Sequence, residues 1–175
     1  MCAETVRPFD QKEPATLKPV TPFCSPRYDE ELRLWLYGNE NLLNGPLSPV
    51  LSAFQIPPFT EHQLDQIEEE AHVLVLSGRI LVTGINHPGF QRSAIVPLRW
   101  GAPRVLCLSG GFYRHLGPDL NQEPYPAARR WRYEFDPTSD LVVSRREPNK
   151  RPTYALHNPT IDKLILDLCL LAQAR

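Results

Sequence analysis

Small and polar residues gather in three loops that could hold a phosphate group. Ser52 lies in the first loop, Thr83-Gly84 opens the second, and Ser109-Gly110-Gly111 opens the third. A phosphate or a nucleic-acid backbone must approach main-chain amides closely, and a side chain at a glycine position would hold it away. The expected ligand contacts are Ser52, Gly84, Asn86, His87, Gly89, Ser109, Gly110, Gly111, Phe112 and Arg114.

The common glycine-rich nucleotide motifs do not explain these loops. Neither Gly-x-Gly-x-x-Gly nor the Walker pattern Gly-x-x-x-x-Gly-Lys-Ser/Thr occurs in the chain. A Gly-Gly pair after a strand is also common in simple turns. The loops therefore predict a phosphate-compatible surface without defining its ligand.

Arginines interleaved with aromatic residues form a second candidate surface. Residues 129–133 read Arg-Arg-Trp-Arg-Tyr, and Arg145-Arg146 follow further along the chain. Guanidinium groups pair with phosphates and aromatic faces accept bases, a combination typical of single-strand binding. A basic patch neutralised by nearby carboxylates, or ion pairs across a dimer interface, would explain the same residues equally well. The nucleic-acid candidates are Arg129, Arg130, Arg132, Arg145 and Arg146.

Catalytic and metal sites are less well supported. His87 and His115 fall in the expected loops, with Ser109 and Asp119 in the neighbourhood, but a histidine beside a Pro-Gly turn is more often a capping or surface residue. The four cysteines are far apart and include no Cys-x-x-Cys pair. We expect no catalytic residue, no metal site and no cofactor, and we expect binding rather than enzymatic activity.

Length and charge limit the remaining possibilities. A chain of 175 residues suits one domain with one core, and a formal net charge of −1 argues against coating of nucleic acid or membranes by charge alone. No stretch approaches the roughly 20 apolar residues that a membrane span needs. We therefore expect a cytoplasmic protein whose nucleic-acid contacts, if any, are local.

The predicted elements place the glycine loops at one edge of a sheet. We expect residues 1–45 to be an extended proline-rich arm followed by a short helix over 29–37, and residues 46–175 to be a Rossmann-like α/β domain. Within that domain the sequence pattern predicts a β-α-β-α-β run and a mostly parallel sheet in a three-layer sandwich. The strands are expected at 50–53, 79–84, 103–108 and 141–143, and the helices at 60–78, 91–100 and 160–174.

Ligands of such sheets bind outside the carboxyl ends of the strands. The three glycine and serine loops follow the first three expected strands, and a helix beginning near Gln91 would add free amides and a partial positive charge at the same edge. The wide apolar surface of the final helix also suggests contact with a second copy of the chain.

The order of these segments resembles a known family. Val50-Leu51-Ser52, Leu81-Val82-Thr83-Gly84 and the run from Val105 to Phe112 are similar to the Rossmann-like core of the DNA-processing protein A (DprA/Smf) family. This family belongs with the lysine-decarboxylase-like nucleotide hydrolases. The resemblance covers roughly residues 46–170 and implies single-stranded DNA binding, a homodimer and partnership with a RecA-type recombinase.

The motifs depart from both groups. Ser52-Ala53-Phe54 stands where the DprA family has Gly-Ser-Arg, and Ser109-Gly110-Gly111-Phe112 lacks the Gly-Thr and the Glu of the hydrolases. The first interpretation is therefore a DprA-like protein that binds single-stranded DNA. The alternative is a sensor or hydrolase of a nucleotide derivative that holds one phosphate in the same loops.

Overall fold

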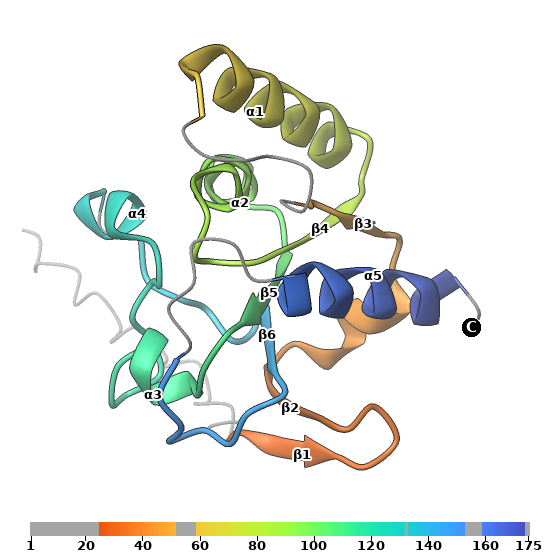
Figure 1. Cartoon of the computed structure of the whole chain (residues 1–175), viewed down its shortest axis with the longest axis vertical. Coiled ribbons are helices and arrows are strands. Elements are labelled where there is room, and N and C mark those ends of the chain that lie inside the picture. The colour runs from red at the N-terminus through yellow and green to blue at the C-terminus, as the bar shows by residue number, and fades with distance from the viewer. Residues whose placement is uncertain (1–24, 52–58, 132, 153–158, 174–175) are drawn as a thin grey trace, which may run out of the picture.

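A computed structural model describes residues 25–51, 59–131, 133–152 and 159–173. These residues form an α/β domain built around one six-stranded sheet (Figure 1). The arm expected over residues 1–28 lies mostly outside the described residues, and so does the loop containing Ser52. None of the helices in the described part of the chain has the length and apolar character that a membrane span requires.

The sheet is mostly parallel, as the sequence predicts. The strand order is β1-β2-β6-β5-β4-β3, in which β3 to β6 run parallel and β1 and β2 are antiparallel additions beside β6. Because β3 to β6 run in the same direction, their carboxyl ends lie along one edge of the sheet. The strands are β1 (Arg27–Asp29), β2 (Leu34–Gly38), β3 (Leu47–Pro49), β4 (Ile80–Thr83), β5 (Arg104–Leu108) and β6 (Leu141–Ser144).

Helices cover both faces of the sheet and give the expected three layers (Figure 1). Val82, Val105 and Val143 pack toward α5, whereas their neighbours Leu106 and Val142 pack toward the opposite face, with Ala94 of α2. All of these strand residues are fully buried, which explains their continuous apolar runs. The helices are η1 (Glu40–Asn44), α1 (Glu61–Leu76), α2 (Pro88–Trp100), α3 (Phe112–His115), α4 (Pro126–Arg130) and α5 (Pro159–Gln173).

The helix expected over residues 29–37 is wrong, because this segment is the hairpin of β1 and β2. The Asp29 carboxylate accepts a hydrogen bond from the amide of Leu32 at 2.9 Å, and Arg33 takes a left-handed φ of 55°. The carboxylate-rich stretch is therefore a turn rather than a first helical turn. From Leu34 onward the side chains alternate between the two faces of the sheet, and β2 pairs with β6.

Two further boundaries differ from the prediction. The first parallel strand is β3, which ends at Pro49 rather than spanning 50–53, although the amide of Val50 still bonds to Val82 O at 2.9 Å. Helix α2 begins at Pro88 rather than at Gln91, with His87 as its N-cap. Proline is favourable at the first position of a helix, where its missing N–H has no cost.

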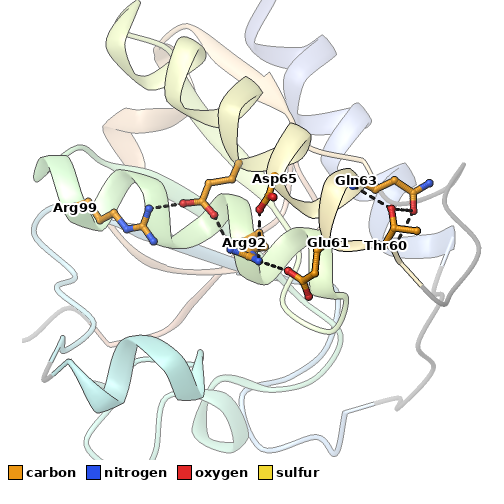
Figure 2. Close-up of polar contacts among 7 residues, drawn as sticks. Thr60, Glu61, Gln63, Asp65, Arg92 and Arg99 are labelled. Atoms are coloured by element: carbon orange, nitrogen blue, oxygen red, sulfur yellow. Dashed lines mark hydrogen bonds and ion pairs between the residues drawn. The ribbon is translucent and has the colours of Figure 1, made fainter.

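Helices α1 and α2 are joined by apolar packing and by the ion pairs that Figure 2 shows. Thr60 caps α1 in a capping box with Gln63. Arg92 of α2 reaches Glu61 at 2.7 Å and Glu68 at 2.9 Å, and Arg99 also pairs with Glu68. The acidic face of α1 is thus partly neutralised by α2, and the pKa of Glu68 is lowered by both arginines despite its partial burial.

Candidate functional site

The carboxyl ends of β5 and β6 meet the first turns of α5 at a pocket of about 330 Å³. Strand β5 supplies Ser109 immediately after its last residue, and β6 supplies Arg145 and Arg146 in the same way. Ser109, predicted to bind phosphate, and Arg145 and Arg146, predicted to bind nucleic acid, therefore line the same pocket. The lining residues are Leu108, Ser109, Arg145, Arg146, Thr160, Ile161 and Leu164.

Hydrogen bonds fix the loops behind this pocket. The side-chain amide of Asn86 donates to Ser109 Oγ at 2.8 Å, which joins the loops after β4 and β5. The Ser144 hydroxyl donates to Gly110 O at 2.9 Å and accepts from the amide of Arg146 at 3.0 Å. The convergence of strand-end loops expected from a parallel sheet is thus present, and it includes a serine at the end of β6.

Arg145 lies alongside the beginning of α5. Its guanidinium donates to Thr160 O at 3.0 Å and to the Asp167 carboxylate at 3.2 Å. Both partners of the ion pair are substantially exposed, with 40% and 46% of the side-chain surface accessible. An anion at the pocket would find two guanidinium groups and the amino-terminal end of a fifteen-residue helix, while Asp167 would compete for Arg145.

Three of the predicted loop positions require glycine because other parts of the chain pack closely against them. A Cβ on Gly84 would lie 2.5 Å from the Phe90 ring, one on Gly110 2.5 Å from the backbone of Pro152, and one on Gly111 2.1 Å from Pro148 O. The amide of Gly111 already donates to Lys150 O at 2.8 Å. The geometry therefore explains these glycines by packing. Direct contact of their amides with a phosphate stays a prediction.

The second loop is built around His87. Its Nδ1 accepts a hydrogen bond from the amide of Gly89 at 3.2 Å, and the ring lies edge-on to Phe59 at 4.4 Å between centroids. His87 is 1% exposed, so capping and packing account for this histidine. Of the remaining predicted ligand residues, Phe112 is fully buried in the core and Arg114 is exposed on α3.

The structure separates the arginine-rich segment from the strand-end pocket. Arg129 and Arg130 are exposed on the short helix α4, followed by Trp131, which is 79% exposed. Arg129 lines a different hollow of about 520 Å³, in the connection between β5 and β6, together with Tyr133 and the acidic Glu134. Arg132 lies outside the described residues.

Burial lowers the pKa of His115 to about 4, so its imidazole ring is uncharged near neutral pH. It lies at the end of α3, and its Nε2 is buried without a hydrogen-bond partner among the described residues. Asp119 is exposed on the following turn. The two histidines of the expected loops thus occupy packed environments.

Sequence reasoning missed a buried ionic network centred on Arg104. This side chain is fully buried and donates to Asp140 at 2.9 Å, to Glu123 at 2.5 Å and to Ala94 O at 2.9 Å. Tyr125, whose ring is 5.8 Å from the guanidinium carbon, donates its hydroxyl proton to Gly84 O at 2.6 Å. Burial raises the pKa of Asp140, and the charge of Arg104 opposes this shift. The network anchors the connection between β5 and β6 to the sheet.

Together, the parallel core, the helices on both faces and the pocket at the strand ends define a Rossmann-like α/β domain. The structure is similar to DNA processing protein A from Streptococcus pneumoniae, with a TM-score of 0.55 and 20% identity, over 78% of this chain and 43% of that one. It is also similar to DNA processing protein A from Helicobacter pylori, with a TM-score of 0.52 and 14% identity, over 77% of this chain and 56% of that one.

These similarities confirm the DprA-like fold expected from the strand and loop order. The chain spans about half the length of the two proteins that it matches. A search with protein-family models and a search of curated proteins gave no match.

Proposed function

We propose that this chain binds single-stranded DNA and that the strand-end pocket holds its phosphate backbone. The observation that carries the proposal is the convergence of Ser109, Arg145 and Arg146 beside the first turns of α5. Ser109 follows β5 and both arginines follow β6, so two separate parts of the chain meet beside a third, the start of α5. Each residue type is suited to an anionic oxygen. The DNA processing protein A of Helicobacter pylori, which shares the fold, binds single-stranded DNA.

Exposed aromatic residues favour a single strand over a duplex. Trp131 is 79% exposed beside Arg129 and Arg130, and Tyr113 is 39% exposed beside Arg114. Aromatic faces stack on bases only where the bases are unpaired, and this contact is tolerant of sequence. The arginines next to them supply the charge that the small net charge of the whole chain does not.

The proposal predicts a defined salt dependence. Fluorescence anisotropy would be measured with a labelled 20-nucleotide oligothymidine at increasing NaCl. The Arg145→Gln/Arg146→Gln double variant should bind more weakly, and the slope of log K against log salt should fall by about 0.7 for each phosphate that is no longer neutralised. Arg99→Gln is the matched control, because Arg99 is an exposed arginine that pairs with Glu68 on α1. Failure of the unaltered protein to bind any oligonucleotide at low salt would contradict the proposal.

A sensor or hydrolase of a nucleotide derivative is the second candidate. The observation in its favour is the volume of the strand-end pocket, about 330 Å³, which lies within the usual size range of small-molecule sites. In this case one phosphate would occupy the position that we assign to the DNA backbone. A melting temperature raised by a mononucleotide, together with no oligonucleotide binding, would favour this candidate.

We also propose that α5 carries the contact between two copies of the chain. Leu166, Leu170 and Leu171 expose 40%, 61% and 45% of their surfaces on this helix. Burial of these side chains against a second copy would remove apolar area from water. Light scattering should therefore give a dimer mass that Leu170→Glu reduces to a monomer mass. Partnership with a RecA-type recombinase rests on the family resemblance alone.

A further inference from the structure

A shallow hollow lies between α3 and the turn that carries Asn149. It has a volume of about 550 Å³ and is lined by Tyr113, Arg114, Pro118 and Asn149. Tyr113 is 39% exposed, and Arg114 and Asn149 are both exposed. The hollow therefore presents an aromatic ring, a guanidinium group, a proline ring and a carboxamide to one space.

Main-chain hydrogen bonds hold the two walls of this hollow together. The amide of Tyr113 donates to Pro148 O at 3.2 Å, and the amide of Gly111 donates to Lys150 O at 2.8 Å. The turn that carries Asn149 is closed by the Lys150 amide, which bonds to Glu147 O at 3.0 Å. Figure 1 shows α3 beside the connection that follows β6. The backbone that carries Tyr113 and Asn149 is consequently fixed before any ligand arrives, which reduces the entropy cost of binding.

The charge of this hollow suits an anionic ligand with a flat, neutral part. Arg114 is the charged side chain among the described residues that line it. The neighbouring hollow, which shares Pro118, is lined by Arg129 but also by the exposed Glu134, whose carboxylate would repel a phosphate. A nucleotide combines the required parts, because its base can stack on tyrosine and its phosphate can pair with arginine.

We propose that the hollow of Tyr113, Arg114 and Asn149 binds one nucleotide of the same strand whose backbone crosses the strand-end pocket. The Tyr113 ring stacks on the base, Arg114 pairs with a phosphate, and the Asn149 carboxamide bonds to the base edge. This inference rests on the proposed function and extends it to a second subsite on α3.

The path between the two sites is short along the chain. Arg146 lines the strand-end pocket and Asn149 lines the hollow, and only two residues of one turn separate them. A strand leaving Arg146 would pass over this turn to reach Tyr113. The segment 147–150 is therefore the bridge between the two subsites.

The first experiment measures the affinity of variants for a 12-nucleotide oligothymidine. Tyr113→Ala should weaken binding about tenfold, the usual effect of removing one base stack, and Tyr113→Phe should bind as the unaltered protein does. Tyr28→Ala is the matched control, because Tyr28 is 41% exposed on β1. Each variant would first be compared with the unaltered protein by thermal unfolding, so that a damaged fold is not mistaken for a weakened binding surface.

The second experiment identifies the contact directly. Photo-crosslinking of an oligonucleotide containing 5-iodouracil, followed by mass spectrometry, should place a cross-link on Tyr113. If the unaltered protein binds, Arg145→Gln/Arg146→Gln weakens binding, and yet Tyr113→Ala binds normally without a cross-link at Tyr113, the subsite is overturned while the proposed function stands. If no oligonucleotide binds at all, both are overturned.

Discussion

The main-chain amide of Gly111 donates a hydrogen bond to the carbonyl oxygen of Lys150 at 2.8 Å. This hydrogen bond joins the loop after β5 to the turn after β6, two segments of the chain that both follow parallel strands. The glycine allows the approach, because a Cβ at this position would lie 2.1 Å from Pro148 O. One edge of the proposed binding surface is therefore held by backbone contacts rather than by long side chains.

Gly111→Ala should destabilise the fold, because the backbone of the facing segment must move to admit the new methyl group. Overpacking of this kind typically costs about 1–3 kcal/mol. Urea unfolding followed by circular dichroism would measure the destabilisation, and anisotropy would measure oligonucleotide binding by the remaining folded protein. Unchanged stability combined with abolished binding would show instead that the glycine is needed for access of a phosphate to the main chain.

Arg104→Met should be far more damaging than the same change at an exposed arginine. It leaves the buried carboxyl groups of Asp140 and Glu123 without their cation, a change that costs about 3–5 kcal/mol in buried ion pairs. Arg92→Met is the control, because its partners Glu61 and Asp65 are exposed and its partly buried partner Glu68 keeps the ion pair with Arg99. Exposed pairs contribute at most about 1 kcal/mol. Equal decreases in unfolding free energy in the two variants would contradict the buried network.

Local signals in the sequence predicted the elements that depend on local chemistry. Thr60 marked the start of α1 and Gly78 its end, and the apolar runs of β4 and β5 were recognisable because both faces of those strands are buried. The convergence of Ser109 with other strand-end residues also followed from the parallel order of the strands.

Contacts between distant residues account for what the sequence did not predict. Glu30 and Glu31 resemble a first helical turn, but the pairing of Trp35 with Ser144 makes the segment part of the sheet. The burial of Arg104 depends on acids 19 and 36 residues away. The covering of Gly110 and Gly111 by the segment after β6 is similarly non-local.

Asp167→Asn should strengthen oligonucleotide binding. The carboxylate of Asp167 pairs at 3.2 Å with Arg145, which lines the strand-end pocket, and would compete with a phosphate for this guanidinium. Because the pair is exposed and screened by salt, we expect a gain of a few-fold that is largest at low ionic strength. Asp65→Asn makes the same charge change on α1, where Asp65 lies 3.7 Å from Arg92, and should leave binding unaltered. Equal effects of the two variants on anisotropy titrations would mean that net charge, rather than the pocket, controls affinity.

His115 should make the fold sensitive to acid. Its pKa is about 4 in the folded chain, because burial disfavours the charged ring, against an ordinary value of 6.5. Between these values the unfolded chain binds a proton that the folded chain does not, so stability falls as pH falls through this window. The full effect of His115 is up to about 3 kcal/mol. Urea unfolding at several pH values would measure this effect. Between pH 6.5 and 4, the unfolding free energy of His115→Gln should change less with pH than that of the unaltered protein. The control His62→Gln changes an exposed histidine of α1 and should show the same pH dependence as the unaltered protein. Parallel curves for His115→Gln and the unaltered protein would show that this histidine is accessible to solvent in the folded state.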